Sequence, residues 1–375
     1  MEHISRIFIL FSGRFPSEKA AALFVSLSAH AFADHAPVCV VVPRRFGAAK
    51  GGVDYFDIAP HVQVVYLPTF DLFYVPILRR IAFPVHTLVF SLMCFVYLLW
   101  KRRAGCVAFA NELGPALVSS CVIPTVFEAH DFPERSLFLY RIMFKRLRAI
   151  LATNIWKEGA LANRFPELAG KIVMERNGVD VEKFSTFRSI KECRSKLGLD
   201  PDAQVVVYTG HLYGWKGIDT ALAAAARMPQ VQYLFVGGSA EELTNMNKYG
   251  TASNVRFVGQ VPHDQVPLWQ GAADVLLLPN TAQEDISAQY TSPMKLFEYM
   301  ASARPIVASD IPSVREIIDE ECAFMYEPDD AQDLVRAVTQ VLDEPNEAGR
   351  RGLIARKRAE YHSWTRRAAR LLKRI

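Results

Sequence analysis

Residues 205–217 read VVVYTGHLYGWKG. The run begins with a continuous apolar stretch, which predicts a strand buried on both faces. Gly210, Gly214 and Gly217 then punctuate a loop, and the alanine-rich segment 217–228 predicts a helix. A strand that leads through a glycine-rich loop into a helix is the building unit of a doubly wound α/β domain.

The same alternation continues on both sides of this unit. In the second half, strands are predicted at 233–236, 255–258, 275–278 and 305–308, and helices at 265–272 and 294–301. In the first half, strands are predicted at 6–11, 38–42, 62–67, 106–110, 124–128, 149–153 and 171–174, and helices at 17–33 and 83–100. We therefore predict an α/β protein of two doubly wound, Rossmann-like domains with a hinge near 178–200, and a ligand site in the cleft between them.

The composition agrees with a globular protein of two or three domains. The chain has 375 residues, of which 51% are hydrophobic and 22% charged, and this excludes extended disorder. Residues 1–190 contain 22 Lys and Arg against 15 Asp and Glu, whereas 191–375 contain 21 against 24. The basic stretches lack interleaved aromatic residues on one face, so we expect no nucleic-acid partner.

The cysteines and the N-terminal segment indicate a compartment. Six cysteines without a CxxC pair predict reduced, buried thiols rather than disulfides or a zinc site. The segment MEHISRIFIL has an acidic Glu2 and a very short apolar run, so it predicts a strand and no signal peptide. We expect a cytoplasmic location.

The segment 83–100, FPVHTLVFSLMCFVYLLW, is nearly all apolar. Its length makes it a marginal candidate for a membrane span. The flanking strands at 62–67 and 106–110 argue against a span if they share one sheet. A buried or interfacial helix is favoured, and contact with a membrane surface is the second interpretation. Basic residues suited to anionic headgroups flank it, namely Arg79, Arg80, Lys101, Arg102 and Arg103.

Two stretches of the second half are candidates for ligand binding. In the loop 210–217, backbone N–H groups near a helix N-terminus and the charge of Lys216 suit a phosphate, although a surface lysine is an equally simple interpretation. In the stretch YTSPMKLFEYM, Ser292 is predicted as the N-cap and Pro293 as the first helical residue. Glu298, nearly two turns further on, is either a surface residue or an acceptor for a ribose diol.

Two loops of the first half end predicted strands and so face the same edge of the sheet. His130 and Asp131 follow one strand, with Glu128 close by, although an isolated histidine is more often structural. Gly13 lies in the loop after the first strand and permits the close approach of a ligand. Ser17 is predicted to cap the following helix. Dinucleotide (GxGxxG), Walker A and GxSxG motifs are absent from the sequence.

Taken together, these stretches resemble glycosyltransferase family 4, the retaining enzymes of the GT-B fold. The likeness covers nearly the whole chain and rests on an ordered set of blocks. These are FEAHD at 127–131, RNGVDVEKF at 176–184, GHLYGWKG at 210–217, FVGG at 235–238, NVRFVGQVP at 254–262, ADVLLLPN at 273–280, SPMKLFEYMASARPIVASDIPSVREI at 292–317 and HSWTRRAARLL at 362–372.

The resemblance implies an acceptor-side domain over 1–180 and a nucleotide-sugar domain over 181–359, with the closing helix 360–375 returning to the first domain. It implies a nucleotide-sugar donor as substrate, a glycan or lipid-linked acceptor, and no metal or other cofactor. Lys216 would contact the diphosphate and Glu298 the ribose. The residues implied to bind the donor are Gly13, Gly210, His211, Lys216, Tyr290, Ser292, Pro293, Met294 and Glu298, and the residues implied to be catalytic are His130, Lys216 and Glu298.

Two positions depart from the family pattern. The first glutamate of the family's E-x7-E motif falls on Tyr290, which cannot supply a carboxylate charge. Glu284 or Asp285 nearby could substitute for it. The basic residue that often follows Gly210 is His211, which donates to phosphate more strongly when protonated.

Three functions agree with this sequence. The leading hypothesis is a retaining glycosyltransferase at the cytoplasmic face of a membrane, suggested by the ordered blocks and the basic first half. The second is a partner subunit that binds a nucleotide without transferring a sugar, suggested by Tyr290. The third is a GT-B epimerase of sugar nucleotides, which would form product without an acceptor.

Overall fold

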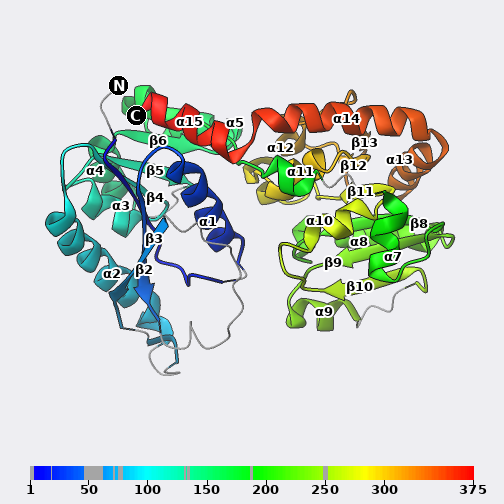
Figure 1. The fold of residues 1–375 in the computed structure, drawn as a ribbon, viewed down its shortest axis with the longest axis horizontal. Helices are drawn as coiled ribbons and strands as arrows, with labels where there is room; N and C mark the ends of the chain where they lie inside the picture. The colour runs from blue at the N-terminus through cyan, green and yellow to red at the C-terminus, as the bar shows by residue number, and fades with distance from the viewer. Residues whose placement is uncertain are drawn as a thin grey trace. The chain divides into compact units, whose positions relative to one another are not determined.

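The computed structural model describes residues 4–17, 19–45, 62–70, 72–74, 79–130, 132, 136–185, 189–247 and 252–375. The chain divides into two compact units (Figure 1). The first unit contains residues 1–176 together with 364–375, and the second contains residues 177–363. Each unit is described by itself below.

The first unit is built on a parallel sheet of seven strands in the order β3-β2-β1-β4-β5-β6-β7. Its inner strands are continuous apolar runs that are buried along nearly their full length, as a sheet covered on both faces requires. The strands are β1 (Arg6–Leu10), β2 (Val38–Arg44), β3 (Val62–Pro68), β4 (Cys106–Ala110), β5 (Thr125–Ala129), β6 (Ala149–Ala152) and β7 (Ile172–Met174).

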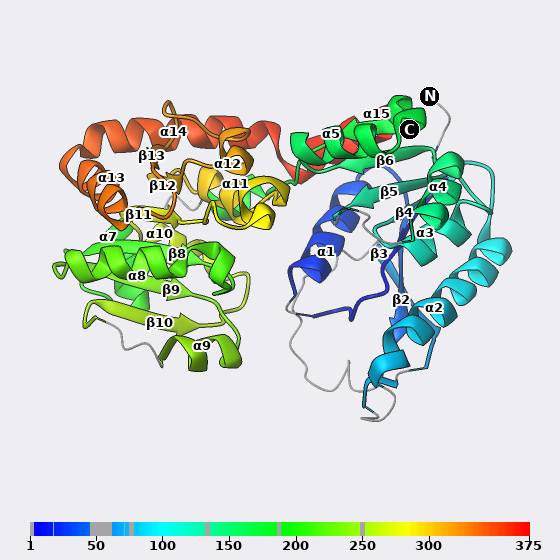
Figure 2. The ribbon, with the colours of Figure 1, turned by 180° about the vertical axis from the view of Figure 1, so that it is seen from behind.

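Helices cover both faces of this sheet (Figures 1 and 2). Helices α1 and α15 pack together on one face, and α3 contacts both α2 and α4 on the other. The apolar core between this second face and its helices includes Phe8 of β1, Phe90 of α2 and Phe144 of α4. The helices are α1 (Ala20–Ala33), α2 (Arg79–Lys101), α3 (Leu113–Ser119), α4 (Leu137–Arg146), α5 (Ile155–Arg164) and α15 (Trp364–Arg374), with short 3₁₀ turns at Leu72–Tyr74 and Pro166–Lys171.

The start of α1 corrects one sequence prediction. The helix begins at Ala20 with Lys19 in the N-cap position, so Ser17 is not its cap. The hydroxyl of Ser17 is buried and has no hydrogen-bond partner among the described residues. Because Ser17 lies three residues before the helix, its side chain cannot reach the amides of the first turn.

Helix α2 is the long apolar helix predicted at 83–100, extended by one turn at its start. Within the described residues, its segment Arg80–Lys101 is the one helix long and apolar enough to cross a membrane by length and composition. The strands that precede and follow it, β3 and β4, belong to the same sheet. Phe90, Cys94 and Leu98 pack into the core beneath that sheet, so α2 is in part a core helix.

The second unit repeats the arrangement with a parallel sheet of six strands in the order β10-β9-β8-β11-β12-β13. Both sheets therefore have the 3-2-1-4-5-6 order typical of Rossmann-like domains. The strands are β8 (Gln204–Thr209), β9 (Val231–Val236), β10 (Val255–Gly259), β11 (Val275–Leu278), β12 (Ile306–Ser309) and β13 (Phe324–Tyr326).

Two apolar cores flank this sheet. Helices α8 and α13 contribute to one core, and α11 and α14 contribute to the other. Asp330 caps α13 by accepting from two amides of its first turn, and Ser189 with Glu192 forms a capping box on α7. The helices are α6 (Val181–Phe184), α7 (Ile190–Leu197), α8 (Ile218–Arg227), α9 (Ala240–Asn247), α10 (Val266–Gly271), α11 (Met294–Ala301), α12 (Pro312–Arg315), α13 (Ala331–Asp343) and α14 (Pro345–Tyr361), with a 3₁₀ turn at Gly214–Lys216 and a π-helical turn at Ile286–Tyr290.

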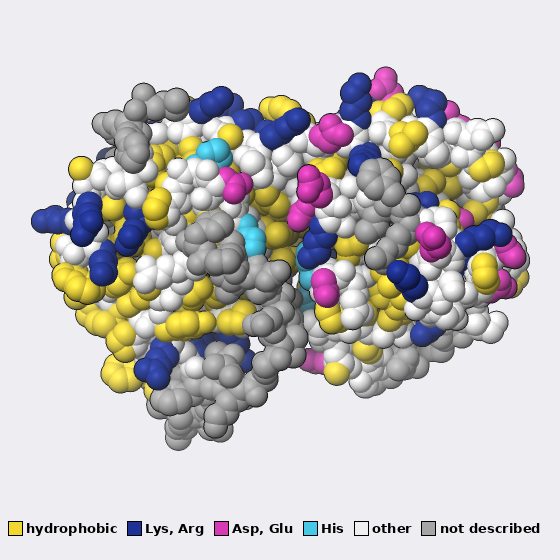
Figure 3. Space-filling model, viewed as in Figure 1, with side chains coloured by type: hydrophobic (Ala, Val, Ile, Leu, Met, Phe, Trp, Pro, Cys, Tyr) yellow, Lys and Arg dark blue, Asp and Glu magenta, His cyan; other side chains and the backbone are white. Residues whose placement is uncertain are grey.

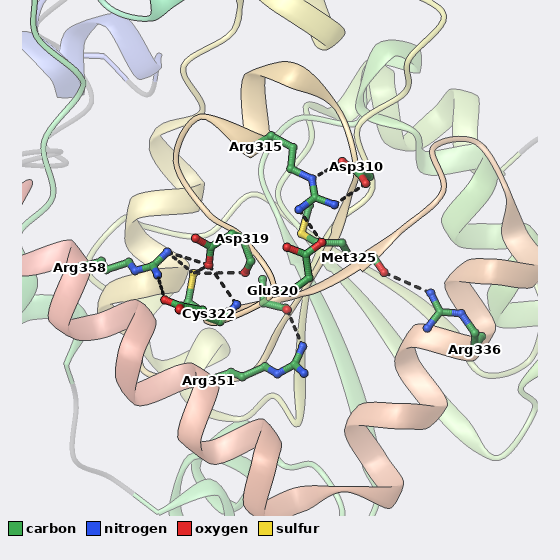
Figure 4. A network of polar contacts seen from close by, with 11 residues as sticks. Asp310, Arg315, Asp319, Glu320, Cys322, Met325, Arg336, Arg351 and Arg358 are labelled. Atoms are coloured by element: carbon green, nitrogen blue, oxygen red, sulfur yellow. Dashed lines mark hydrogen bonds and ion pairs between the residues drawn. The ribbon is translucent and has the colours of Figure 1, made fainter.

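A network of polar contacts attaches α14 to the segment that leads into β13 (Figure 4). The guanidinium of Arg358 lies 2.9 Å from Asp319, and Arg351 donates to the carbonyl oxygen of Ala323 at 2.9 Å. Strand β13 was not predicted, because its three residues are too short a run to stand out in the sequence.

Candidate functional site

The loop after β8 has a backbone that only glycine accommodates at two positions. Gly210 and Gly217 have φ angles of 125° and 69°, in the region that side chains rarely adopt. A Cβ on Gly217 would lie 1.7 Å from the carbonyl oxygen of Pro279, which follows β11. The loops after β8 and β11 are therefore in direct backbone contact.

The end of β9 joins the same cluster. A Cβ on Gly237 would lie 2.4 Å from the carbonyl oxygen of Gly210. Because all the strands are parallel, these loops gather at the C-terminal edge of the sheet, where α/β domains bind ligands. The segments that follow β8, β9 and β11 thus bring their backbones close together. This part of the surface is formed by backbone atoms rather than by side chains.

Lys216 lies at the end of this glycine loop and is buried. Its ammonium nitrogen sits 3.6 Å from the centroid of the Trp215 ring, and no carboxylate among the described residues forms an ion pair with it. Burial lowers the pKa of Lys216 to about 7. Lys216 therefore has no counter-charge among the residues that the structure describes.

Lys295, in the first turn of α11, is a second cation of the same kind. Its stem is partly exposed, but its ammonium nitrogen is buried and has no hydrogen-bond partner among the described residues. That nitrogen lies 3.7 Å from the centroid of the Tyr208 ring and 3.1 Å from the point where a Cβ on Gly210 would stand. Burial, and then the charge of Lys216, hold the pKa of Lys295 well below its ordinary value, and the nearby charge of Glu298 acts in the opposite direction.

Lys295 was not predicted as a site residue, although it lies within the stretch 292–317 that resembles the family. Lysine in the first turn of a helix is unfavourable next to the positive end of the helix dipole. It also stands in an otherwise apolar turn, between Met294 and Leu296. An unfavourable cation at a helix N-terminus was the signal that could have identified it.

The two lysines make this edge of the sheet an anion site. A buried ammonium group without a counter-charge is costly, so it either loses its proton or binds an anion. Two such groups beside a glycine-walled loop suit a ligand with more than one negative charge, such as a diphosphate.

His211, in the same loop, is oriented by Glu242 of α9. Its Nδ1 lies 3.0 Å from the Glu242 carboxylate, and its ring stacks on Tyr213 with centroids 4.9 Å apart. Although burial acts in the opposite direction, hydrogen bonds from the Leu212 amide and His211 lower the pKa of Glu242. The Glu242 carboxylate accepts a hydrogen bond from Nδ1 of His211. A neutral His211 then has its proton on Nδ1, so its Nε2 can only accept a hydrogen bond. Donation from Nε2 to an anion then requires the imidazolium form.

Glu298 lies one turn beyond Lys295 on α11. Its carboxylate lies 3.3 Å from Nε2 of His263, whose Nδ1 is 3.2 Å from the ammonium nitrogen of Lys183. Both His263 and Glu298 have side chains that are mostly buried. This chain of contacts fixes the Glu298 side chain on the same helix that supplies Lys295.

The segment before α11 differs from its prediction. The helix begins at Met294, and Pro293 is its N-cap, with an extended ψ of 108°. Ser292 is therefore outside the helix, and its hydroxyl is buried with no hydrogen-bond partner among the described residues. Its carbonyl oxygen accepts from the Asn177 amide at 2.8 Å. Tyr290 lies in the π-helical turn, and its hydroxyl is 3.5 Å from the Asp285 carboxylate.

In the first unit, the loop after β1 is fixed by buried polar groups. The Ser12 hydroxyl donates to Glu112, and the Ser12 carbonyl oxygen accepts from Arg45 at 3.1 Å. A Cβ on Gly13 would lie 2.2 Å from the ring of Phe11, so only glycine fits between that ring and the loop. Glycine at position 13 thus has a local structural role, and the approach of a ligand there stays a prediction.

His130 follows β5, and its ring meets the Phe24 ring edge-on with centroids 4.7 Å apart. Its carbonyl oxygen accepts a hydrogen bond from the buried Lys157 ammonium. Glu128, which was expected near the site, instead pairs with Arg367 of α15, so its carboxylate has a structural partner. Asp131 lies outside the described residues.

The predicted residues therefore fall into two groups. Gly210, His211 and Lys216 share one loop of the second unit, whose segment in and just before α11 contains Tyr290, Ser292, Pro293, Met294 and Glu298. Gly13 and His130 belong to the other unit. Within the described residues, no group of three or more His, Cys, Asp or Glu side chains is arranged to hold a metal ion.

Two doubly wound parallel sheets in one chain, with a candidate anion site at the C-terminal edge of the second, are the architecture of the GT-B class. A solved structure of this fold is Alr3699/HepE from Anabaena in complex with UDP, with a TM-score of 0.75, 19% identity, and coverage of 99% of this chain and 100% of that chain. The same Anabaena protein has also been solved with UDP-glucose.

Residues 203–344 match the family model of glycosyl transferases group 1. The chain is 25% identical over 203 residues to the sulfoquinovosyl transferase SQD2 of Arabidopsis thaliana, covering 52% of this chain and 38% of that protein. It is 26% identical over 217 residues to D-inositol 3-phosphate glycosyltransferase 2 of Catenulispora acidiphila, covering 53% and 49%. The chain spans about half or less of the length of these curated relatives.

Proposed function

We propose that the protein is a retaining glycosyltransferase. It moves a sugar from a nucleotide-sugar donor to a glycan or lipid-linked acceptor at the cytoplasmic face of a membrane. The observation that carries this proposal is the pair of buried ammonium groups, Lys216 and Lys295, beside the glycine loop of β8. The family match at 203–344 supports the sugar transfer, because it covers the domain that contains both lysines.

The chemistry of the lysines follows from the charge that the reaction develops. Cleavage of a glycosyl–diphosphate bond leaves negative charge on the diphosphate and oxocarbenium character on the sugar. Lys216 and Lys295 are already desolvated, so they stabilise the leaving diphosphate more strongly than exposed lysines could. Protonated His211 adds a third donor at Nε2. These cations supply the leaving-group stabilisation, and we propose that no metal ion is required.

We propose uridine as the base of the donor, since the structural relative from Anabaena was solved with UDP and with UDP-glucose. Glu298 is the proposed acceptor for the ribose hydroxyls, because its carboxylate lies one turn beyond Lys295 and is oriented by His263. His130 is the proposed contact for the sugar, and the Gly13 loop the proposed acceptor side. We propose that the acceptor attacks from the face of the leaving group, which retains the anomeric configuration.

The inactive-subunit hypothesis stays as the second candidate because Tyr290 replaces a motif carboxylate. The carboxylate of Asp285 lies 3.5 Å from the Tyr290 hydroxyl, so this segment still presents an acidic group. We favour the enzyme for this reason, with Asp285 as the proposed replacement.

A thermal-shift screen with UDP, GDP and ADP and their sugars tests donor binding, because a specific ligand raises the unfolding temperature. We expect UDP and a UDP-sugar to stabilise the wild type, and Lys216→Met to abolish the shift. Mass spectrometry of a reaction with donor and candidate acceptors then tests transfer. Nucleotide binding without transfer to any acceptor would support the inactive subunit, and product formed from the donor alone would support an epimerase.

A further inference from the structure

Helix α2 presents a stripe of large apolar side chains to solvent. Leu88 is 71% exposed and Trp100 is 75% exposed, although the opposite face of the helix is buried in the core. Soluble proteins rarely leave so continuous an apolar surface without a partner. The stripe repeats at helical spacing and consists of Ile81, Leu88, Leu92, Val96, Leu99 and Trp100.

Two further exposed apolar side chains lie at the start of α4. Phe138 and Leu139 at the start of α4 are 74% and 42% exposed. Helix α3 contacts both α2 and α4, so the three helices cover one face of the sheet. Figure 3 shows hydrophobic side chains gathered along the left flank of this unit, over the position of α2 in Figure 1, with Lys and Arg side chains beside them.

A cavity of about 580 Å³ opens just beyond the C-terminal end of α2. It lies where β4 and β5 begin, so it is at the opposite edge of the sheet from Gly13 and His130. No aspartate or glutamate contributes to its lining among the described residues. Its basic lining residues are Arg102, Arg103, Arg148, Lys373 and Arg374. Ile375 also lines the cavity, and its carbonyl oxygen accepts from Nε of Arg148 at 2.9 Å, so Arg148 already has a partner there.

The stripe and the cavity meet at consecutive residues. Trp100 ends the stripe, and the ammonium nitrogen of Lys101 lies 3.7 Å from the centroid of its ring. Arg102 and Arg103 then line the cavity. An apolar stripe that ends in tryptophan and arginine is the pattern of a helix at a membrane–water interface.

We propose that this surface of α2 binds a bilayer that contains anionic phospholipid. The stripe lies at the boundary between headgroups and acyl chains, and the basic cavity takes a headgroup phosphate. A protein partner would account for the stripe without a cavity lined by cations, and a nucleic acid would account for the cations without the stripe. A bilayer accounts for both. This inference rests on the proposed function, which places the reaction at a membrane. It adds which surface of the protein binds the membrane and which class of lipid is bound.

The helix lies parallel to the bilayer in this arrangement. Its two ends lead into β3 and β4, which are strands of one sheet, so α2 cannot leave that sheet to span the membrane. Its buried face, with Phe90, Cys94 and Leu98, stays in the core of the unit. Only the exposed half of the helix is available to lipid.

Vesicle flotation tests the proposal with the full chain. We expect binding to vesicles of phosphatidylcholine with phosphatidylglycerol, weak binding to phosphatidylcholine alone, and a loss of binding as salt is raised. Arg102→Ser/Arg103→Ser should weaken binding by about 30-fold, and Leu88→Ser/Leu92→Ser by about tenfold or more. All four residues are exposed or lie at an exposed end of the helix, so both variants should fold. The matched control is Leu353→Ser/Lys357→Ser on exposed positions of α14, which should bind as the wild type does.

Four results would overturn the proposal. Equal binding to neutral and anionic vesicles, or wild-type binding by the arginine variant, would show that the cavity holds no headgroup. Stabilisation by inorganic phosphate without vesicle binding would make the cavity a site for a soluble anion. Conversion of a wild-type dimer to a monomer by Leu88→Ser/Leu92→Ser, without vesicle binding, would make the stripe a self-association surface.

The UDP-induced thermal shift separates this inference from the proposed function. Both α2 variants should keep that shift, because their residues are outside the nucleotide unit. If the wild type binds vesicles but shows no UDP-induced thermal shift, the membrane-binding surface is supported and the proposed nucleotide-sugar donor is contradicted. A UDP shift without vesicle binding would do the reverse.

Discussion

Arg367 on α15 forms a buried ion pair with Glu128 at the end of β5, across 239 positions of the sequence. Their side chains are only 2% and 8% exposed. The Nε of Arg367 also donates to the carbonyl oxygen of Arg176 at 2.9 Å. The last helix of the chain is thereby attached to the sheet of the first unit.

Removing one partner of this pair should destabilise the first unit strongly. Arg367→Met leaves the Glu128 carboxylate buried without a counter-charge, which costs about 3–5 kcal/mol. Urea unfolding followed by a fluorescence probe in the first unit measures this loss.

The matched variants decide whether the cost is the unpaired charge. Arg367→Met/Glu128→Met removes both charges and should recover most of the lost stability. Arg141→Met breaks a more exposed ion pair with Glu167 in the same unit and should change little. If the double variant is as unstable as Arg367→Met, the ion pair is not the cause.

The glycine loop of β8 gives a second prediction. Gly217→Ala forces a left-handed backbone on a side chain and places its Cβ 1.7 Å from the Pro279 carbonyl oxygen. A left-handed backbone alone costs a residue with a side chain roughly 1–2 kcal/mol. We expect Gly217→Ala to lose more stability than this and to lose the UDP-induced thermal shift.

Two other glycines separate the causes. Gly198 has a similar φ of 65° but open space around its Cβ position, so Gly198→Ala should show the backbone cost alone. Gly214 has neither a positive φ nor a neighbour within 4 Å, so Gly214→Ala should be nearly neutral. Equal losses for Gly217→Ala and Gly198→Ala would refute the contact with Pro279.

Local patterns predicted every described strand except β13, whereas helices such as α13 and α14 were not predicted. The strands at 106–110 and 275–278 and the helix at 294–301 have the same bounds in sequence and structure. Each is a continuous apolar run or an apolar-periodic segment bounded by turn residues, which is information that the local sequence contains. The parallel direction of the strands in both sheets follows from the alternation of strands and helices.

Features that depend on tertiary packing were not predictable. Lys295 looked like an ordinary helical residue, because its burial comes from the loop after β8 rather than from its neighbours in sequence. Ser292 matched an N-cap by type, but Pro293 has an extended backbone and the helix begins after it. Glu128 was expected near the site, but its carboxylate pairs with Arg367 of the distant helix α15. In each case a distant segment decides what the side chain does.

Lys295 should be a strong determinant of nucleotide affinity. A hydrogen bond to a charged group contributes about 1.5–3 kcal/mol, so Lys295→Met should weaken UDP binding by about 10- to 150-fold in isothermal titration calorimetry. The same variant removes a buried, unpaired ammonium group and should raise the unfolding temperature of the ligand-free protein.

This combination of effects distinguishes the anion site from a structural role. A lysine that supported the fold would lose stability and affinity together. Lys191→Met provides a control on the same unit, since its side chain is exposed and pairs with the exposed Asp202. A ligand-free protein that is destabilised by Lys295→Met, with UDP binding intact, would contradict the assignment.

The pKa of Lys216, lowered to about 7 by burial, predicts that donor binding depends on pH. Above that value the free protein has a neutral Lys216, so binding of a diphosphate must take up a proton. Affinity for UDP-glucose should therefore fall as the pH rises through 7 and 8, whereas the diphosphate of this ligand does not titrate there. Calorimetry in buffers of different ionisation enthalpy measures the proton uptake, which Lys216→Met should reduce.

Stability should change with pH in the opposite direction. The folded-state pKa of Lys216 lies below its unfolded value, so between about pH 7 and 10.5 the unfolded chain binds more protons from this group. The free energy of unfolding of the ligand-free protein should therefore gain a positive slope with pH in this window. Lys216→Met should flatten that slope, and Lys357→Met, at an exposed lysine of α14, should leave it unchanged. A wild-type slope that survives Lys216→Met would show that other groups cause it.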